Sequence, residues 1–414
     1  MDNSQTNLLR ERFLKDYEDW RRTGKEPSLA SKDMRYYLDN NEKRLRDKGF
    51  SVNESFAVVE DNVIGNVDRS SGEYSATISY RELRHDTEYY KDGKAVKKFS
   101  NPETVYVTVL DKEGYEDFPC TCPNCGHRAM ASELHGGCPY CGTVFEIDQT
   151  YPCVTSMYSV PGIVERKKFE VFFKKKVIMT GIFTGLVFFL IYFFTAASEY
   201  VIWFRILMSL FMGALLGALC AFLTYMVKSV TLLVKVFGLA GKSLQLLGGI
   251  GTKKKLTRYM EQSDPGYSFE LFEGKIISLL RAIAFSDNRT GLSIYSGNDD
   301  LKYMDNLVDM QYRGAIQLKN FRLQDGMTKI TLKAFMTDTY ADKDRIKVKD
   351  ENFEIECQRK SEGVFDLGFS VHAVKCRTCG GSFDAMHEKK CPFCGNEYDL
   401  VQDDWIITSV SRKK

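Results

Sequence analysis

The chain has 414 residues, of which 44% are hydrophobic and 13% aromatic, so it contains enough apolar material for packed cores and is not a disordered protein. Its length predicts two or three domains and excludes a single small module. The formal charge of +2 describes no single part of the chain, because the apolar and basic residues are concentrated in one central stretch.

Residues 1–164 are predicted to form an α+β domain. A helix at 8–22 carries apolar residues at helical spacing on one side: Leu9, Phe13, Tyr17 and Trp20. Strand patterns follow at 56–64, 74–82, 105–110 and 152–158. Turn sequences such as Ser70-Ser71-Gly72 and Lys91-Asp92-Gly93 separate them. We expect helices that cover one face of a curved antiparallel sheet.

Four cysteines near the end of this region have the spacing of two metal knuckles: Cys122, Cys125, Cys138 and Cys141. In each knuckle two residues separate the cysteines and a glycine follows the second one. The pattern recurs near the end of the chain with the same spacing inside each knuckle: Cys376, Cys379, Cys391 and Cys394. Two knuckles complete a tetrahedral four-thiolate site that leaves no open position for catalysis.

We therefore predict two structural zinc ions, one in a zinc ribbon at residues 120–145 and one in a zinc ribbon at 376–398. Iron in rubredoxin-type sites is the alternative metal, since four thiolates suit both. Disulfides are the other alternative, but a cytoplasmic location disfavours them. Of the remaining cysteines, Cys120 is a competing ligand, and the others are expected to be packing residues: Cys153, Cys220 and Cys357.

Two transmembrane helices are predicted at 177–197 and 201–227. The first segment has 21 residues and no charge, and at about 1.5 Å per residue it covers the roughly 30 Å hydrocarbon core. The second carries only Arg205, which lies near its start. A buried helical hairpin in a large soluble core is the alternative, although such helices seldom lack a polar face for so long.

Basic residues flank the predicted hairpin. Residues 165–176 contain six basic residues and two glutamates, and 228–258 contain seven basic residues and no acidic one. The connecting loop at 198–200 has no basic residue. The positive-inside rule therefore places both termini on the cytoplasmic side of the cell membrane, with the basic flanks on anionic headgroups.

Glycines are spaced one helical turn apart in both spans. Gly181 and Gly185 in the first span lie at the same distances from the loop as Gly217 and Gly213 in the second. Small residues allow helix backbones to approach closely, so we expect the helices to pack there. The alternative is that glycine is simply common in membrane helices.

Residues 228–258 are predicted to form a basic interfacial helix and a linker. Lys228, Lys235 and Lys242 recur every seven residues among apolar ones, which is typical of a helix lying on a membrane surface. The linker is expected at Gly248, Gly249 and Gly251. A continuation of the second span is the competing interpretation.

Residues 259–414 repeat the first region. A helix at 268–286 precedes strand patterns at 314–323, 329–336, 353–359, 366–374 and 405–410. Aligning Cys141 with Cys394 without a gap places Thr155 on Thr408, so the repeat continues beyond the knuckles. The expected fold class is α+β, with two cone-like domains, each with an inserted zinc ribbon, flanking an α-helical transmembrane hairpin.

The second region resembles a known family at three sequences: Asp264-Pro-Gly-Tyr-Ser-Phe-Glu-Leu-Phe, Tyr312-Arg-Gly-Ala-Ile-Gln-Leu, and Asp404-Trp405-Ile-Ile-Thr-Ser-Val. These are similar to the Tim forty-four-like domain, which belongs to the nuclear-transport-factor-two-like cone folds. The resemblance implies a platform at a membrane that docks protein, peptide or lipid partners, with protein transport as the expected process. Nothing in the chain resembles the chaperone-recruiting segment of the mitochondrial import subunit.

A non-catalytic membrane scaffold is therefore the expected function, and no catalytic residue is assigned. An enzyme or a small-ligand binder that uses the cone pocket is the alternative, with His85 as the histidine that lies apart from the knuckles. Nucleic-acid binding is not expected, because residues 1–164 carry a net charge of −6 and 259–414 carry −3.

Overall fold

The computed structural model describes residues 2–59, 64–71, 73–134, 137–143, 147, 149–161, 166–195, 201–261, 263–362, 374–386 and 388–413. Within them, it describes the side chains of all residues except 69–71, 161, 166–174, 228–250, 290 and 382. The chain forms two compact units. Residues 1–162 and 245–414 form one of them, the head unit, and residues 163–244 form the other, the hairpin unit.

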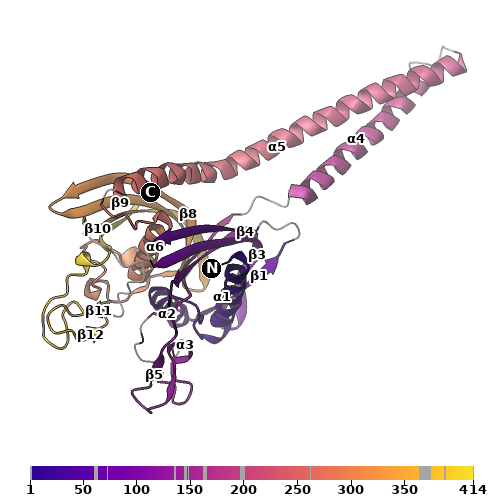
Figure 1. The fold of residues 1–414 in the computed structure, drawn as a ribbon. Coiled ribbons are helices and arrows are strands. Elements are labelled where there is room, and N and C mark those ends of the chain that lie inside the picture. Colours follow the sequence, from indigo (N-terminus) through magenta and orange to yellow (C-terminus); the bar gives the residue numbers. More distant parts are fainter. Residues whose placement is uncertain are drawn as a thin grey trace. The chain divides into compact units, whose positions relative to one another are not determined.

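The first half of the head unit contains these elements: α1 (Asn3–Thr23), α2 (Lys32–Asp47), β1 (Phe50–Val58), β2 (Ile64–Ser71), β3 (Tyr74–Lys91), β4 (Lys94–Lys112), β5 (Pro119–Thr121), β6 (Arg128–Met130), α3 (Ala131–Leu134) and β7 (Cys153–Pro161). The larger sheet is antiparallel with the order β1-β3-β4-β7, and β2 also pairs with β3 (Figure 1). Helix α1 extends the predicted helix in both directions, whereas α2 has no counterpart in the sequence prediction. The predicted strand at 56–64 overlaps the end of β1, and part of it lies outside the described residues.

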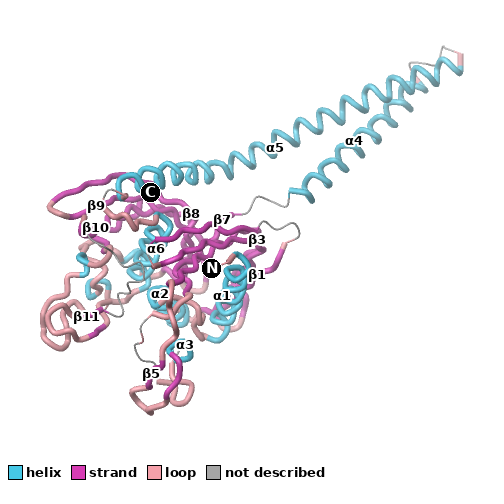
Figure 2. Tube along the Cα trace, viewed as in Figure 1, coloured by secondary structure: helices cyan, strands magenta, loops and turns pink. Residues whose placement is uncertain are grey.

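The second half repeats this arrangement with α6 (Phe269–Phe285), three short 3₁₀ turns (Arg289–Gly291, Lys302–Met304 and Leu400–Gln402), β8 (Leu307–Gln324), β9 (Met327–Asp342), β10 (Arg345–Lys360), β11 (Val374–Lys375), β12 (Ser382–Phe383) and β13 (Ile406–Lys413). Its larger sheet has the order β8-β9-β10-β13. Figure 2 shows the strands of the chain in magenta and the helices in cyan. Ser268 and Ser286 cap α6, as the predicted helix requires. The strand predicted at 366–374 lies almost wholly outside the described residues.

Matching irregularities support the internal repeat. The register of β7 against β4 shifts at Thr155, and that of β13 against β10 shifts at Thr408, which is the residue aligned with Thr155. Next to each shift a parallel bridge connects the strand to a segment of its own half, Ala30 with Val154 and Tyr295 with Ile407. Chance alignment of two unrelated sheets would not place a bulge and a bridge at the same two positions.

The two halves are one unit and not the separate domains predicted at 1–164 and 259–414. Helix α2 packs on α6 of the other half. Arg44 donates to the carbonyls of Ala284 at 2.6 Å and Phe285 at 2.9 Å, which satisfies C-terminal carbonyl groups of α6. Asn41 donates to the carbonyl of Val308 at 2.6 Å.

A shared apolar cluster completes the junction between the halves. Its buried residues come from α2, β1 and β3 of the first half and from β8, β9 and β10 of the second: Leu45, Phe50, Val52, Tyr89, Val308, Ala341 and Ile346. Separating the halves would expose this cluster and the groups paired across the junction to water, which explains why they fold as one body.

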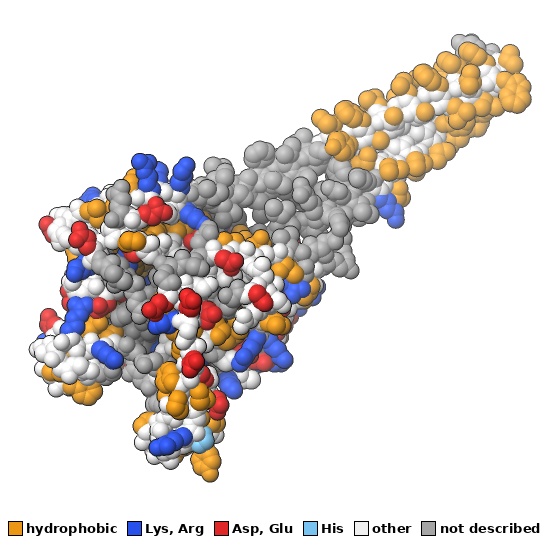
Figure 3. Space-filling model, in the orientation of Figure 1, with side chains coloured by type: hydrophobic (Ala, Val, Ile, Leu, Met, Phe, Trp, Pro, Cys, Tyr) orange, Lys and Arg blue, Asp and Glu red, His pale blue; other side chains and the backbone are white. Residues whose placement is uncertain are grey.

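The hairpin unit is built on α4 (Arg166–Phe194) and the first part of α5 (Ile202–Met260). Lys175–Phe194 and Ile202–Val227 are long and apolar enough to span a membrane. Their outward side chains are almost all hydrophobic (Figure 3). The end of the first predicted span, residues 196–197, lies outside the described residues. Arg205 donates to the carbonyl of Phe193 at 2.7 Å, near the end of α4.

The glycines of the two spans meet as predicted. A Cβ atom added to Gly217 would lie 2.7 Å from the carbonyl oxygen of Gly181, and one added to Gly213 would lie 2.8 Å from that of Gly185. These contacts leave no room for a side chain, so the close approach of the backbones requires glycine.

Replacing Gly217 by leucine is therefore expected to force the two spans apart. The added side chain meets backbone, which cannot move aside, so we expect a loss of about 1–3 kcal/mol. Thermal unfolding of the detergent-solubilised protein measures the loss. Ala218→Leu, which adds the same bulk on the exposed face of α5, is the matched control and should change little. Equal effects of both substitutions would contradict the close packing.

Helix α5 has no break between Val227 and Met260. Gly248, Gly249 and Gly251 lie inside it, so the predicted linker is wrong, and the competing interpretation of a continued second helix is favoured. Glycine weakens a helix by only about 1 kcal/mol per residue, and the apolar and basic residues around these glycines continue the helical pattern.

Candidate metal centres and the inter-repeat pocket

Each half contains one cluster of four cysteine thiols. Among the described residues, the Sγ atoms of Cys122, Cys125, Cys138 and Cys141 all lie within 4.8 Å of one another, and so do those of Cys376, Cys379, Cys391 and Cys394. In the first cluster the Cys122–Cys141 and Cys125–Cys138 sulfur distances are 3.7 and 3.6 Å. The equivalent pairs of the second cluster are both 3.6 Å apart. All eight predicted ligands are thus brought together in two groups.

The backbone of every knuckle is folded in the same way. The first cysteine accepts a hydrogen bond from the amide of the glycine four residues later, at 2.8–2.9 Å in all four knuckles. Its own amide donates to the carbonyl of the residue after that glycine. The four glycines have φ between 70° and 75°, a conformation that a side chain disfavours: Gly126, Gly142, Gly380 and Gly395. The following glycine predicted from the sequence is therefore a requirement of the turn.

The clusters fit a tetrahedral metal ion. A ligand distance of about 2.3 Å separates the sulfurs of a regular tetrahedron by about 3.8 Å, close to the spacing in both clusters. Amide side chains also join the knuckles of each cluster: Asn124 donates to Thr143, and Asn396 donates to Thr378, each at 2.8 Å. The two four-cysteine clusters are positioned to bind metal ions, with thiolates as the complete ligand set.

The two ribbons differ in what supports them. The first has its own small cluster of buried residues: Cys122, Ala131, Leu134, Cys138 and Ile147. The second ribbon contributes to the main core of its half: Val374, Cys376, Phe383, Met386 and Cys391. Ser293 also donates its amide to the carbonyl of Met386 at 3.1 Å. The segment that carries the second four-cysteine cluster is therefore part of the main core of its half.

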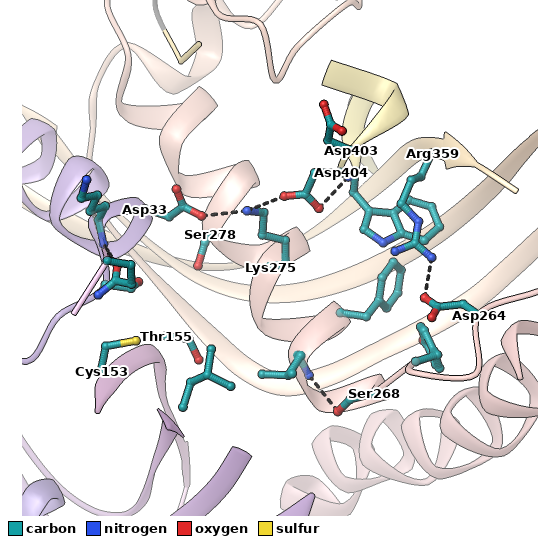
Figure 4. Close-up of a pocket in the computed structure, with 18 of the residues that line it drawn as sticks. Asp33, Cys153, Thr155, Asp264, Ser268, Lys275, Ser278, Arg359, Asp403 and Asp404 are labelled. Atoms are coloured by element: carbon teal, nitrogen blue, oxygen red, sulfur yellow. Dashed lines mark hydrogen bonds and ion pairs between the residues drawn. The ribbon is translucent and has the colours of Figure 1, made fainter. Parts of the chain in front are cut away.

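A pocket lies between the two repeats (Figure 4). Its cavity volume is about 110 Å³, and its walls come from the start of α2, from β7 and from α6, β10 and the segment before β13. Tyr151 and Asp404, which the repeat alignment pairs, both line it. The pocket is thus formed where the last large strand of each repeat begins.

Ion pairs hold the walls of this pocket. The Lys275 ammonium lies 2.7 Å from Asp33 and 2.6 Å from Asp404, so it connects α2 of the first half to the strand entry of the second. Burial lowers the pKa of Lys275, but the two carboxylates outweigh it and the pKa is raised. Arg359 pairs with Asp264 at 2.7 Å, and its guanidinium lies 4.8 Å from the centre of the Trp405 ring. The two carboxylates therefore favour the charged form of Lys275.

The second ribbon positions one wall of the pocket. Tyr398, at the end of the ribbon, donates its hydroxyl to Asp403 at 2.5 Å, and Arg377 of the first knuckle pairs with the same carboxylate. Asp403 directly precedes Asp404, the partner of Lys275. An intact knuckle thus helps to hold the pocket wall in place.

His85 lies in a buried cluster of charges inside the first half. Its Nδ1 is 3.0 Å from Glu103, and its Nε2 is 3.8 Å from Glu54. Burial lowers the pKa of His85, but hydrogen bonds to the two carboxylates raise it to about 10. Burial raises the pKa of Glu54, whereas Arg21 and His85 lower it to about 2. His85 is thus a buried ion-pair partner.

Sequence reasoning quoted Asp264 and Asp404 within the motifs of the family resemblance, but it did not predict the pocket that they line with Lys275. Lys275, Asp33 and Asp404 have no common motif, and only the packing of α2 on α6 brings them together. The one available signal was Lys275 itself, a cation between the apolar residues of an amphipathic helix. Of the other cysteines, Cys153 and Cys357 are buried, which raises the pKa of each thiol, as expected for packing residues.

Glu273 gives the head unit a pH dependence. It is buried on α6 and accepts a hydrogen bond from Tyr312 at 2.5 Å. Burial raises its pKa from 4.5 to about 7 despite that hydrogen bond. Since the folded state holds the proton more tightly than the unfolded state does, this group stabilises the fold most below pH 4.5, and the contribution is lost as the pH rises to about 7.

Glu273→Gln is therefore expected to be more stable than the parent at pH 8 and to lose that advantage below pH 5. The expected difference is about 3 kcal/mol, which corresponds to a shift of somewhat over two pH units. Urea unfolding at several pH values measures it as a difference from the parent, so that other titrating groups cancel. Glu261→Gln, at an exposed glutamate, should give a constant difference. A constant difference for Glu273→Gln would contradict the buried proton.

These features must be interpreted from their own geometry. No protein-family model, curated protein or solved structure matches the chain.

Proposed function

We propose that this chain is a non-catalytic membrane scaffold or adaptor whose head unit docks a protein or peptide partner in the inter-repeat pocket. The two halves are cone-like repeats of the Tim forty-four-like type, and the function belongs to protein transport. The observation that carries the proposal is the pocket between the two repeats. Ion pairs of Lys275 connect the repeats at this pocket, and the chain also contains two helices that are apolar enough to span a membrane.

The two metal ions are proposed to be structural zinc in zinc ribbons. All the ligands are protein thiolates, so a bound ion has no open position for a substrate, and its contribution is to fold the ribbons. Iron is the less favoured alternative, because both metals accept four thiolates at this spacing. Metal analysis and the visible spectrum of the purified protein distinguish them.

The proposed location is the cell membrane, with two spans and both termini in the cytoplasm. The support is the pair of apolar helices and the basic residues next to each of them. A cytoplasmic location of the head unit suits the two four-thiol clusters, because the cytoplasm keeps cysteines reduced and able to bind metal.

The charges of the pocket support docking rather than catalysis. Lys275 and Arg359 are each neutralised by carboxylates, and Cys153 is held as a neutral thiol by burial. A cavity of about 110 Å³ accepts one side chain of a partner. A small-ligand binder that uses the same cavity is the second candidate, favoured by the same enclosed volume.

Site-specific photocrosslinking in the membrane tests this function. A photoreactive phenylalanine analogue replaces Tyr151, which lines the pocket, and a control replaces exposed Leu8 on α1. We expect a discrete protein adduct from position 151 and none from position 8. Ser278→Leu, which fills part of the pocket, should abolish the adduct while both metal ions and the melting temperature are retained.

Two outcomes decide against the proposal. Equal adducts from both positions would show that the pocket is not the docking site. A small molecule that co-purifies with the parent and is lost in Ser278→Leu, without any protein adduct, would establish the small-ligand binder instead.

A further inference from the structure

Two β-turns of the head unit form a surface with a net positive charge. Residues 91–98, around the β3–β4 turn, contain four lysines and one aspartate. Residues 342–350, around the β9–β10 turn, contain three lysines, one arginine and three aspartates. Together they carry a net charge of +4, although both halves of the chain outside the membrane flanks are acidic. We call these two segments the basic turn surface.

The two turns lie together although about 250 residues separate them in sequence. The Lys91 ammonium donates to the carbonyl of Lys343 at 3.2 Å and lies 3.6 Å from the carboxylate of Asp344. Beneath them lies the apolar cluster shared by the two halves. The basic turn surface is therefore one fixed surface.

Many of its cations are free of carboxylates. Among the described residues, five exposed bases of these turns have no carboxylate oxygen within 4.0 Å: Lys94, Lys97, Lys343, Arg345 and Lys349. Exposed Val348 lies between two of the lysines in the sequence. Four of the five are lysines, whose compact charge suits a diffuse anionic surface better than a paired recognition site, for which arginine is preferred.

The last strand of the first half runs toward one of these two turns. Strand β7 runs from the partner of Leu110 to the partner of Glu103, so its last residue, Pro161, points along β4 toward the turn at Lys94. Five residues after Pro161, α4 begins with a run of basic residues.

The C-terminal part of α5 lies beside β8. The Thr252 hydroxyl accepts a hydrogen bond from the amide of Leu318 at 2.8 Å, and the Tyr259 ring stacks on Phe321 at 4.9 Å, so α5 and β8 run in the same direction here. This common direction holds beside Leu318 and Phe321, because the register of β8 against β9 shifts between Tyr312 and Ile316.

We propose that the basic turn surface contacts the anionic lipid headgroups of the membrane in which the protein is anchored. This inference rests on the proposed membrane anchoring. The anchor supplies a high local concentration of lipid, and each lysine near an anionic leaflet adds attraction that salt weakens.

Hydrogen exchange of the full-length protein in nanodiscs tests the contact. Nanodiscs of phosphatidylcholine are compared with nanodiscs that contain 30% phosphatidylglycerol. We expect amide exchange in 91–98 and 342–350 to slow by about fivefold or more in the anionic nanodiscs and to recover in 0.5 M salt. The β8–β9 turn at Gln324 to Met327, at the opposite end of the same sheet, is the internal control and should not change.

A set of substitutions provides the second readout. The protection should disappear when four lysines of the surface are changed together: Lys94→Gln, Lys97→Gln, Lys343→Gln and Lys349→Gln. It should persist in a control with the same charge change at exposed lysines elsewhere: Lys319→Gln, Lys329→Gln, Lys360→Gln and Lys390→Gln.

The outcomes separate this inference from the proposed function. Equal exchange of the turns in both lipids, with the chain still resistant to alkaline carbonate extraction, overturns the headgroup contact and leaves the anchor intact. Extraction of the chain by carbonate overturns the anchor itself. If slower amide exchange in the two turns requires an added soluble protein and also occurs in neutral nanodiscs, the surface binds an acidic protein instead of lipid headgroups.

Discussion

Cys391→Ser is expected to remove one metal ion and to destabilise the whole head unit, whereas Cys138→Ser removes one ion and unfolds only the first ribbon. Both residues are the buried first cysteine of the second knuckle in their repeat. Structural zinc contributes about 10–16 kcal/mol to the folding of small metal domains, so a ribbon without it does not stay folded. The difference between the two substitutions arises from what each ribbon supports.

The second ribbon is part of the main core, and it also holds Asp403 through Tyr398 and Arg377. Its unfolding exposes buried residues of the second half and loosens the wall of the pocket. The first ribbon buries a separate small cluster, so its unfolding leaves the larger sheet covered. Because the halves share a core, we expect the loss of the second ribbon to affect both halves, whereas the loss of the first ribbon should stay local.

Elemental analysis and thermal unfolding measure these effects. The parent should contain two metal ions per chain and each variant one, with a much larger drop in melting temperature for Cys391→Ser. Cys120→Ser is the control, because Cys120 lies in β5 outside the cluster of four thiols and should leave two ions bound. Equal melting temperatures for the two ligand variants, or two ions retained in either, would contradict this account.

Arg21→Met is expected to cost about 3–5 kcal/mol of folding free energy, since it leaves buried carboxylates without their cation. Arg21 is buried and lies 3.4 Å from Glu54 and 3.8 Å from Asp309. Its guanidinium also donates to Asn41 at 2.6 Å and lies 4.2 Å from the centre of the Trp20 ring. The group thus joins α1, α2 and β1 of the first half to β8 of the second.

The next residue in the chain is a matched control. Arg22 is 64% exposed and pairs with Asp19 on the surface of the same helix, so Arg22→Met should change stability by less than about 0.5 kcal/mol. Urea unfolding of the detergent-solubilised protein compares the two variants. Adding Asp309→Asn to Arg21→Met should recover part of the loss, because it removes one uncompensated charge. Similar stabilities of Arg21→Met and Arg22→Met would show that the cluster is dispensable.

Local patterns in the sequence were sufficient for the metal centres and the hairpin. The knuckles depend on a two-residue spacing and a glycine with positive φ, and both are contained in five consecutive residues. The spans depend on the length of an apolar run, and the glycine contacts depend on their distance from the loop. The internal repeat was also visible, since the gap-free alignment beyond the knuckles placed Thr155 on Thr408.

The boundaries of the larger elements were less well determined. Helix α2 was missed because its apolar stripe is shared with buried polar residues such as Asn41 and Arg44, whose partners lie in the other half. The linker at Gly248 was predicted from glycine content alone, which raises the free energy of a helix but does not by itself end one.

By itself, the sequence determined which cysteines form the two four-thiol clusters, which segments are apolar enough to cross a membrane, and that the chain contains a repeat. Only the tertiary structure decided that the repeats form one head unit, that Lys275 connects Asp33 to Asp404 across a pocket, and that two basic turns lie side by side. The physical reason is separation along the chain. Metal knuckles and membrane spans are stabilised by contacts within a few tens of residues, whereas the pocket and the turn surface arise from contacts between residues about 130 to 250 positions apart. Such contacts leave no periodicity or motif in the sequence, because each residue needs only to complement a partner that the fold brings to it.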